Sequence, residues 1–239
     1  MQLADISWDQ CQEYLTYDNR ILLPIGATEA HGRHLGLGCD HILAEAIARQ
    51  AGEQTGVLVA PVLAYGMSYH LTKFPGTLSL APATLVLVLR DLLYAAYQYG
   101  FRRMVVVNGH GGNDPSLSSA AADLGREFAD LRIKNLTWWT EPAVAQLVDQ
   151  AAGSQRGTHA STHETAFLMA TRPEAIHMDR VARRDAPVEP SRDLINPRMF
   201  AEKYPDSVMG LAPLRATPEL GQQILSIAVD LCVQELGNW

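Results

Sequence analysis

The sequence has few cysteines, no strongly basic stretch and no long apolar run. Only three of its 239 residues are cysteines, Cys11, Cys39 and Cys232. They are far apart and odd in number, which excludes a disulfide framework and a CxxC zinc ribbon. No apolar stretch reaches the roughly 18 residues of a membrane-spanning helix, and the start, MQLADISWDQ, lacks the features of a signal peptide. We therefore expect a cytoplasmic protein with no membrane partner.

Positive charge is also scarce. The formal net charge is −7, and the longest arginine-rich piece, residues 180–184, is short. A nucleic-acid-binding protein needs a basic surface to displace counterions, so we expect no nucleic-acid partner. The sequence contains no GxSxG motif, and nothing suggests a base for Cys39. A serine or cysteine nucleophile is therefore disfavoured.

Apolar runs rich in β-branched residues alternate with helical patterns along the chain. Such alternation predicts an α/β fold, a three-layer α/β/α sandwich with a mostly parallel central sheet. Proline near a helix start and glycine after a helix end mark several boundaries. The expected strands are 21–26, 57–64, 104–108 and 133–138, and the expected helices are 40–54, 82–99, 114–129, 141–152, 161–171 and 217–236.

No linker or internal repeat interrupts this alternation, so we interpret residues 1–239 as a single domain. The one irregular piece is 181–213, which contains five prolines. It is too long for an ordinary connection, and we expect either a lid or an arm that contacts another subunit. Arginines in and beside it hint at an anionic substrate; they are Arg183, Arg184, Arg192 and Arg198.

A polar segment follows the first expected strand. Ligands of open α/β sheets bind at the carboxyl ends of strands. Glu29 and His31 are two residues apart and point the same way in an extended chain, and Asp40 follows a glycine-rich loop. We interpret these three residues as metal ligands. A solvated loop is the alternative for Glu29 and His31, and the N-cap of the next helix is the alternative for Asp40.

The segment NGHGGN, residues 108–113, surrounds His110 with three glycines just before an expected helix. Glycines let a backbone approach a ligand closely, and the helix dipole favours an anion. A phosphate-binding loop is therefore one alternative, although the pattern is neither GxxxxGK[ST] nor GxGxxG. A structural histidine is another. We interpret His110 as a metal ligand.

His159 and Glu164 lie five residues apart where a late helix is expected to begin. We interpret His159 as a catalytic acid–base, and Glu164 as a catalytic carboxylate or a metal ligand. Ser161 and Glu164 also fit a capping box, which is the alternative for Glu164.

Other polar and aromatic side chains lie beside these segments. The candidate substrate-binding residues are Ser68, His70 and Trp139. Core or interface packing is the alternative for both Trp138 and Trp139. We expect three further histidines to face solvent or to support the ligands; they are His34, His41 and His163.

Together the segments resemble the creatininase, or creatinine amidohydrolase, family. The motifs stand in the family's order and extend over nearly the whole chain. They are Glu-x-His-Gly-x-His-Leu-x-Leu-Gly-x-Asp at 29–40, Phe-Pro-Gly-Thr at 74–77, Asn-Gly-His-Gly-Gly-Asn at 108–113, His-Ala-x-x-x-Glu-Thr at 159–165, and Val-Met-Gly at 208–210 with Ala-Thr at 216–217 and Gly221.

The resemblance implies a three-layer α/β/α domain with one or two divalent metal ions per subunit. Zinc is the expected metal, with manganese or iron(II) as alternatives. It also implies a homo-oligomer, frequently a hexamer, that hydrolyses an amide-type C–N bond in a small cyclic or formyl substrate. By position, the matched metal ligands are Glu29, His31, Asp40 and His110, with Asp40 in the bridging place. His159 matches the catalytic or substrate-binding histidine, and Glu164 the nearby acidic residue.

The chain departs from the family's pattern at several positions. Creatininases proper can carry a glutamate two residues after the NGH histidine, where this chain has Gly112. Creatinine as the substrate is therefore in question, and Glu164 becomes the candidate for the missing carboxylate. Arg33 and Gly36 replace the usual prolines of the first motif, and Cys39 replaces the usual threonine before the aspartate. The start of the late helix also differs from the family's pattern, at Ser161, Thr162 and Ala166.

Histidines and carboxylates together suit zinc, manganese or iron(II), which lower the pKa of a bound water from about 16 to about 7. We therefore expect metal-activated water to attack a carbonyl, and His159, tuned by Glu164, to protonate the leaving nitrogen. The alternatives are a formamide deformylase, a peptide-trimming protease, a hydrolase that opens a cyclic keto-sugar or keto-inositol, and a non-catalytic metal-binding protein.

Overall fold

The computed structural model of the chain describes residues 1–153, 157–181, 196–210 and 215–239. Its central sheet has four strands, all parallel, in the order β2-β1-β3-β4. The strands are β1 (Arg20–Ile25), β2 (Leu58–Val59), β3 (Arg103–Asn108) and β4 (Arg132–Leu136). Ile25 pairs with Asn108, so the two central strands end side by side.

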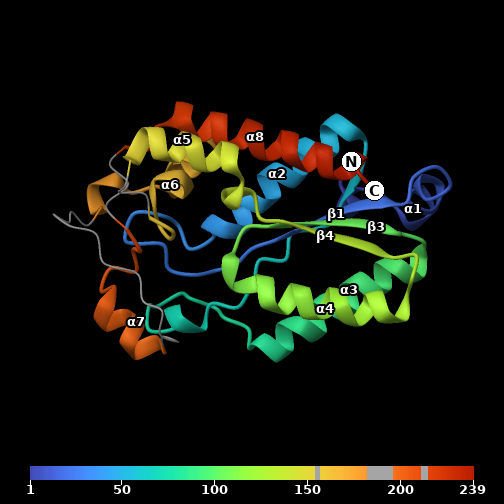
Figure 1. Cartoon of the computed structure of the whole chain (residues 1–239), viewed down its shortest axis with the longest axis horizontal. Helices are drawn as coiled ribbons and strands as arrows, with labels where there is room; N and C mark the ends of the chain where they lie inside the picture. The colour runs from blue at the N-terminus through green and yellow to red at the C-terminus, as the bar shows by residue number, and fades with distance from the viewer. Residues whose placement is uncertain (154–156, 182–195, 211–214) are drawn as a thin grey trace.

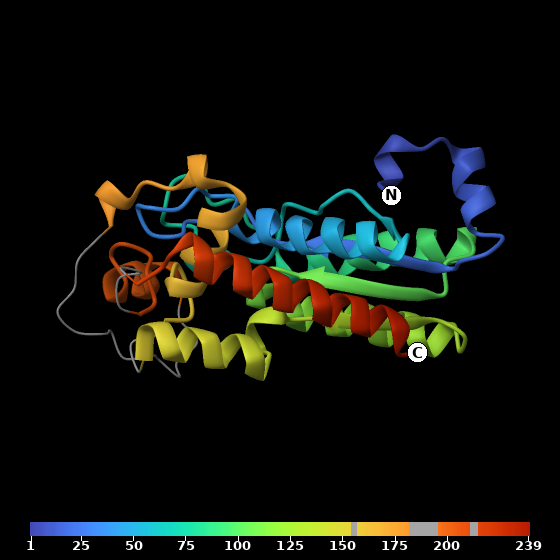
Figure 2. The ribbon, with the colours of Figure 1, turned by 90° about the horizontal axis from the view of Figure 1, so that it is seen from above.

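Helices cover both faces of the sheet, as Figure 1 shows. One face carries α2 (Cys39–Thr55), α5 (Pro142–Ala152), α6 (Thr162–Thr171) and α8 (Pro218–Gly237). The other face carries α3 (Pro82–Tyr99) and α4 (Asp114–Glu127). The view from above shows α2 and α8 side by side over the sheet (Figure 2). The predicted three-layer α/β/α sandwich with a parallel sheet is confirmed.

The two central strands bury both of their faces. Side chains alternate along a strand, so Leu22, Val105 and Val107 join the core beneath α2 and α8, whereas Met104 and Val106 join the core above α3 and α4. A strand that is buried on both sides needs a continuous apolar run. This requirement explains why the polar side chains of the first and third motifs follow the carboxyl ends of these strands rather than lying within them.

The helix boundaries follow the signals in the sequence closely. The predicted helix 82–99 is confirmed, with Pro82 in its first turn and Gly100 at its end in the left-handed region, at φ +118°. The alternative interpretation of Asp40, as the N-cap of this helix, is wrong. Gly38 is the N-cap of α2, and Asp40 lies inside the first turn.

Two strands are shorter than the apolar pattern predicts. The strand expected at 57–64 pairs only over Leu58–Val59. Pro24, on the neighbouring strand, has no N–H to donate to the ladder beyond that point. Pairing resumes only as an isolated bridge between Ile25 and Leu63. The strand expected at 133–138 ends at Leu136, and Trp138–Thr140 forms a 3-10 turn.

The N-terminal segment forms a 3-10 turn, Leu3–Asp5, and the helix α1, Trp8–Tyr14, neither of which was predicted. A capping box opens α1, because the backbone N–H of Ser7 donates to Gln10 Oε1 at 2.9 Å. The Ser-x-x-Gln pattern is the signal that could have revealed this helix.

The segment 181–213 is only partly described. Within it, α7 (Pro197–Lys203) is a helix where irregular chain was expected, and Asn196 caps it by accepting a bond from Met199 N at 2.9 Å. Arg198 is exposed and pairs with Glu202 at 2.9 Å rather than facing a site. Three of the predicted arginines lie outside the described residues; they are Arg183, Arg184 and Arg192.

Within the described part of the chain, none of the helices combines the length and the hydropathy needed to cross a bilayer.

Candidate metal centre

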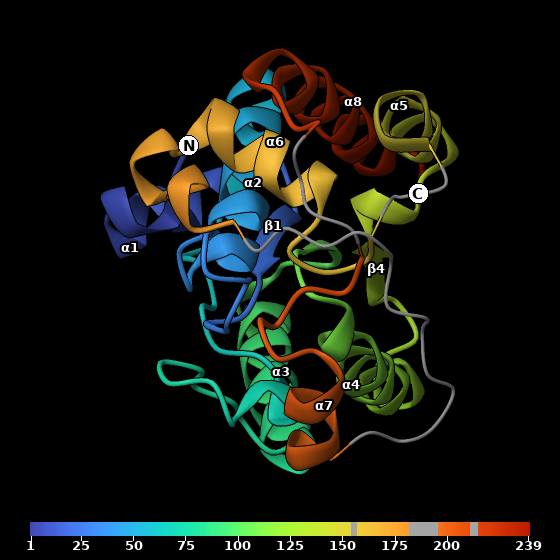
Figure 3. The same ribbon diagram turned by 90° about the vertical axis from the view of Figure 1, so that its left-hand side faces the viewer.

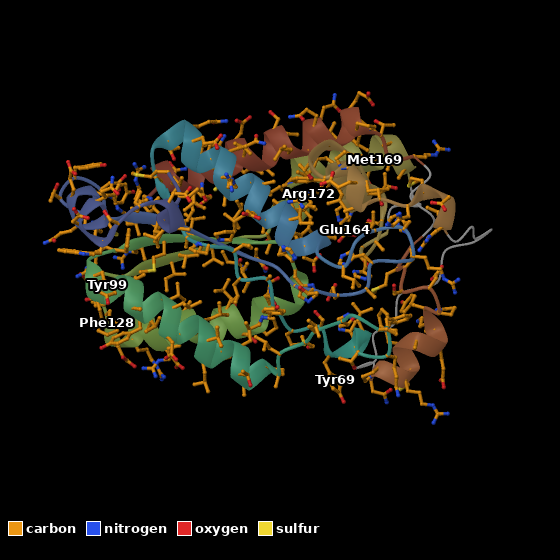
Figure 4. The ribbon with its side chains drawn as sticks, turned by 180° about the vertical axis from the view of Figure 1, so that it is seen from behind. Tyr69, Tyr99, Phe128, Glu164, Met169 and Arg172 are labelled. Atoms are coloured by element: carbon orange, nitrogen blue, oxygen red, sulfur yellow. The ribbon has the colours of Figure 1, made fainter. Side chains whose placement is uncertain are left out.

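Side chains from four separate segments meet at the carboxyl ends of β1 and β3. Glu29 and His31 lie in the loop after β1, His110 lies just after β3, Asp40 opens α2, and Glu164 opens α6. Figure 3 faces this end of the molecule, where α2 and α6 approach the strand ends. In Figure 4, Glu164 lies far from Tyr99 and Phe128, which mark the opposite end.

Two glycines let the start of α2 rest directly on the strand ends. A Cβ atom on Gly109 would lie 2.1 Å from the backbone oxygen of Asp40, and one on Gly26 would lie 2.3 Å from the backbone nitrogen of His41. Neither position can accept a side chain without movement of the backbone. This contact fixes the Asp40 carboxylate at the helix N-terminus, where the helix dipole favours a negative charge.

The carboxylate of Asp40 lies between two groups of donor atoms. On one side, His110 Nδ1 lies 3.2 Å from Asp40 Oδ2 and 3.4 Å from Glu29 Oε1. On the other side, His31 Nε2 lies 2.9 Å from Asp40 Oδ1 and 3.6 Å from Glu164 Oε1. Each oxygen of Asp40 therefore faces a different histidine.

Three histidine rings are each held at one nitrogen by a backbone carbonyl. Such a bond fixes the tautomer and leaves the other ring nitrogen free to bind a metal or to carry a proton. The held nitrogen and its carbonyl are His31 Nδ1 with Glu29 O at 3.2 Å, His110 Nε2 with Met67 O at 2.9 Å, and His159 Nε2 with Ala30 O at 2.8 Å. The remaining nitrogen of each ring faces the carboxylates.

The donor atoms are buried and lack hydrogen-bond partners among the described residues. Glu29 and His31 are fully buried, and neither oxygen of Glu29, nor Asp40 Oδ2, nor His31 Nε2 makes a hydrogen bond. These atoms nevertheless lie close together, in groups whose donor atoms are within 4.8 Å of one another. Burying carboxylates in this way is costly unless a cation satisfies them. The residues therefore fit a divalent metal ion.

The same groups shift one another's pKa values. Burial disfavours charge on the histidines, but Asp40 raises the pKa of His31 well above its ordinary value, and Glu29 and Asp40 raise the pKa of His110 to about 9. Burial opposes the charge of the carboxylates too, yet His31 lowers the pKa of Asp40 and that of Glu164, the latter to about 2. In the metal-free protein, protonated histidines therefore supply the positive charge that balances these carboxylates. A bound cation would supply it instead.

His159 lies beside this cluster, as predicted. Its Nδ1 is 3.5 Å from Glu29 Oε1, and its ring centre is 4.2 Å from that of His31. The following residue, Ala160, is held at φ +52°, an uncommon conformation for a residue other than glycine. Burial and the nearby His31 lower the pKa of His159. The ring is therefore neutral at neutral pH, with a lone pair on Nδ1.

Glu164 caps a helix with one carboxylate oxygen and turns the other towards the cluster. Its Oε2 accepts a hydrogen bond from the backbone N–H of Ser161 at 3.1 Å and so caps α6. Its Oε1 faces His31. Beside it, His163 is buried and its Nδ1 lies 2.6 Å from Ser161 Oγ, so this histidine supports the site rather than facing solvent.

A cavity of about 280 Å³ opens on the cluster. Of the candidate substrate-binding residues, His70 and Trp139 line the cavity, whereas Ser68 is fully buried and does not. Trp138 is 1% exposed and packs mainly in the core. A larger cavity, of about 860 Å³, lies between α1 and α3, and the described residues that line it include no histidine or carboxylate.

Sequence reasoning missed the backbone groups that shape the site. The carbonyls of Met67 and Ala30 orient two histidines, and backbone groups have no sequence signature. A Cβ atom on Gly112 would lie 2.4 Å from Met67 O, so this position cannot hold the glutamate of creatininases proper without rearrangement. Met209 reaches the cavity through a bridge to His159 that connects distant parts of the chain.

The parallel α/β/α fold and the buried histidine–carboxylate cluster at its strand ends define a metal-dependent hydrolase. The chain belongs to the creatininase family: the family profile described as creatinine amidohydrolase matches residues 4–236.

Relatives with different activities share most of the chain. A mycofactocin precursor peptide peptidase from Mycobacterium ulcerans is 33% identical, over 92% of this chain and 85% of its own. A creatinine amidohydrolase from Pseudomonas putida is 27% identical, over 99% of this chain and 94% of its own. A 3-dehydro-scyllo-inosose hydrolase from Thermotoga maritima is 28% identical, over 71% of this chain and 56% of its own.

Solved creatininase structures share the fold. A creatininase variant of the Zn-Zn type and a structure described as creatininase Mn each superpose with a TM-score of 0.87 at 25% identity, covering 98% of this chain and 96% of the other.

Proposed function

We propose that this protein hydrolyses an amide-type C–N bond in a small cyclic or formyl substrate, with a divalent cation held by the histidine–carboxylate cluster. The observation that carries the proposal is the set of buried, unpartnered donor atoms of Glu29, His31 and Asp40 beside a cavity of about 280 Å³. Unpartnered ligand atoms can bind a metal ion, and the adjacent cavity can hold a substrate next to that ion.

Two groups of residues can hold ions. One consists of Glu29, Asp40 and His110, and the other of His31, Asp40 and Glu164. Nitrogen and oxygen donors in this mixture suit zinc, with manganese or iron(II) as alternatives. When bound, such a cation polarises a carbonyl oxygen and lowers the pKa of water towards neutrality.

His159 moves the proton in this proposal. Its Nε2–H is occupied by Ala30 O, so only Nδ1 can take a proton from the attacking water. Glu29 Oε1, 3.5 Å from Nδ1, stabilises the imidazolium that forms. The proton then passes to the nitrogen that leaves the carbonyl carbon. Trp139, on the cavity wall, offers a flat face to a planar substrate.

The size of the cavity favours a small substrate. About 280 Å³ lies at the lower end of the volumes of ligand pockets. The second candidate is a peptide bond, because the peptidase relative has the higher identity, 33%. A keto-inositol ring is the third, by likeness to the inosose hydrolase.

A substrate screen tests the proposal. Protein loaded with zinc or manganese is incubated with creatinine, cyclic ureas, formamides, short peptides and keto-inositols, and new amine, carboxylate or ring-opened products are detected by mass spectrometry. We expect turnover of a small amide that is lost after chelation and in Glu29→Gln. Turnover by the chelated protein or by Glu29→Gln at the wild-type rate would contradict the proposal. A metal-loaded protein that cleaves none of these compounds would favour the non-catalytic alternative.

We also propose that residues 1–239 form one domain, that the protein assembles into a homo-oligomer, and that it works in the cytoplasm. The family profile spans residues 4–236, which supports a single domain. Exposed apolar side chains on α1 and α3, among them Trp8 at 79% and Tyr99 at 76%, support self-association. Cysteines without disulfide bonds are typical of a reducing compartment. Sedimentation equilibrium of the purified protein tests the assembly, and a monomer would contradict it.

A further inference from the structure

Cys39 lies directly before Asp40 in the first turn of α2, on the His31 side of the metal centre. Donor atoms of His31, Cys39 and Asp40 all lie within 4.8 Å of one another. Cys39 and His31 are fully buried, and Asp40 is 2% exposed. The thiol therefore belongs to the same buried cluster as two of the proposed ligands.

A second observation points to a ligand at this place. His31 Nε2 is buried without a hydrogen-bond partner, although it lies 2.9 Å from Asp40 Oδ1 and 3.6 Å from Glu164 Oε1. The sulfur of Cys39 lies within 4.8 Å of the donor atoms of His31 and Asp40. A tetrahedral ion takes four ligands, so a thiolate can complete a set that contains this nitrogen and the two carboxylates.

The two sides of the centre differ in their donor atoms. The side formed by Glu29, Asp40 and His110 offers two carboxylates and one imidazole, and no sulfur. The side formed by His31, Asp40 and Glu164 has Cys39 beside it. Soft sulfur ligands select zinc, whereas oxygen-rich sites also accept manganese.

We propose that Cys39 is a thiolate ligand of the ion on the His31 side and makes that side selective for zinc over manganese. Binding replaces the S–H bond by a sulfur–metal bond, and the proton passes to the buffer. The inference rests on the proposed metal centre and adds to it a ligand and a metal preference.

Cys232 provides a matched control. It is fully buried in the same apolar core cluster as Cys39, on α8, but it is near no group of candidate ligands among the described residues. If Cys39 served only as a small apolar side chain in the core, replacing either cysteine would have the same kind of effect.

Cobalt(II) reports a thiolate ligand directly, because sulfur-to-cobalt charge transfer absorbs in the near ultraviolet. The full-length wild-type protein, Cys39→Ser and Cys232→Ser are freed of metal and titrated with cobalt(II), and the bound cobalt is counted by elemental analysis. We expect the band in the wild type and in Cys232→Ser, and its loss in Cys39→Ser, which still binds cobalt. Cys39→Ala replaces Cys39→Ser if the serine variant does not fold.

Competition between zinc and manganese gives an independent measurement. We expect Cys39→Ser to lower the preference for zinc at least about tenfold, as is common when a group that supports a metal is lost. Cys232→Ser keeps the wild-type preference.

Three outcomes are informative. Stoichiometric cobalt without the band in the wild type would overturn the role of Cys39 and leave the metal centre intact. A band that persists in Cys39→Ser would do the same. A wild-type protein that binds no cobalt, zinc or manganese would overturn the metal centre and this inference together.

Discussion

Glu164 caps α6 with one carboxylate oxygen and faces His31 with the other. An amide in its place can still accept the Ser161 N–H but carries no charge. Glutamine also loses the attraction between the carboxylate and His31. We therefore expect Glu164→Gln to destabilise the metal-free fold less than Glu164→Ala does, and to lower zinc affinity about 10–100-fold. Glu164→Ala loses the cap as well, at a cost of about 1 kcal/mol in the free energy of unfolding. Urea denaturation of the metal-free proteins and zinc titration measure the two effects.

Equal destabilisation by glutamine and alanine would show that the hydrogen bond to Ser161 does not account for the stabilising role of Glu164. Wild-type zinc affinity in Glu164→Gln would remove this residue from the ligand set.

His159 is expected to separate catalysis from metal binding. Its Nδ1 must be unprotonated to accept a proton, and burial together with His31 lowers its pKa from the ordinary value of 6.5. A bound cation would lower this pKa further. The acid limb of kcat/KM should therefore lie below pH 6.5. His159→Ala should retain its metal, lose about 10²- to 10⁴-fold in turnover, and show a flatter acid limb.

The measurement is a pH–rate profile combined with elemental analysis of the same samples. If His159→Ala loses metal in proportion to activity, this histidine is a ligand rather than a proton carrier. Its distance of 3.5 Å from Glu29 Oε1 makes that a real alternative.

At the scale of elements, the contact between the β3 end and the start of α2 determines where Asp40 lies. Gly109→Ala places a methyl group against the backbone of Asp40. We expect this overpacking to cost about 1–3 kcal/mol in the free energy of unfolding and to weaken zinc binding as α2 shifts. Gly125→Ala is the control, since nothing lies within 4 Å of the added atom and alanine should stabilise helix α4 by about 0.5–1 kcal/mol.

Denaturant unfolding of both variants checks the prediction. A Gly109→Ala protein as stable as the wild type, with unchanged zinc affinity, would mean that α2 is not held in place by this contact.

The helices and strands also show which structural features local sequence patterns can predict. Helices α3 and α6 were predicted within about a residue, because proline, glycine and capping signals are local. The length of strand β2 was overestimated, because pairing beyond Val59 would need an N–H from Pro24, which lies in another strand. Pairing partners are set by tertiary structure, which a run of apolar residues does not specify.

At the scale of the whole molecule, the centre draws residues from loops and helices that span positions 29 to 164. Sequence motifs were enough to identify Glu29, His31, Asp40, His110 and Glu164 as one group. They could not reveal that Asp40 faces two histidines with different oxygens, or that Ser68 lies away from the cavity. Those features depend on how α2 and the loop after β2 pack against the strand ends.

Because the proposed ligands come from segments distant in sequence, a cation that binds them binds only the folded chain. At a free zinc concentration 100 times the dissociation constant, we expect a stabilisation of about 2.7 kcal/mol. For a chain of this size that corresponds to a rise of roughly 5–10 °C in the melting temperature. Chelation should reverse the rise. Asp40→Asn should show little rise at the same zinc concentration.

The zinc-dependent rise should grow with pH. In the metal-free protein the pKa of His110 is raised to about 9 and that of His31 is raised as well. Protonation of these rings stabilises the metal-free fold below their unfolded pKa, and that contribution is lost as pH rises towards 9. Over the same range, zinc has fewer protons to displace. Calorimetric scans at pH 6.5 and pH 8.5, with and without zinc, should therefore show the larger shift at the higher pH. A shift that is equal or smaller at pH 8.5 would show that zinc does not bind through these histidines.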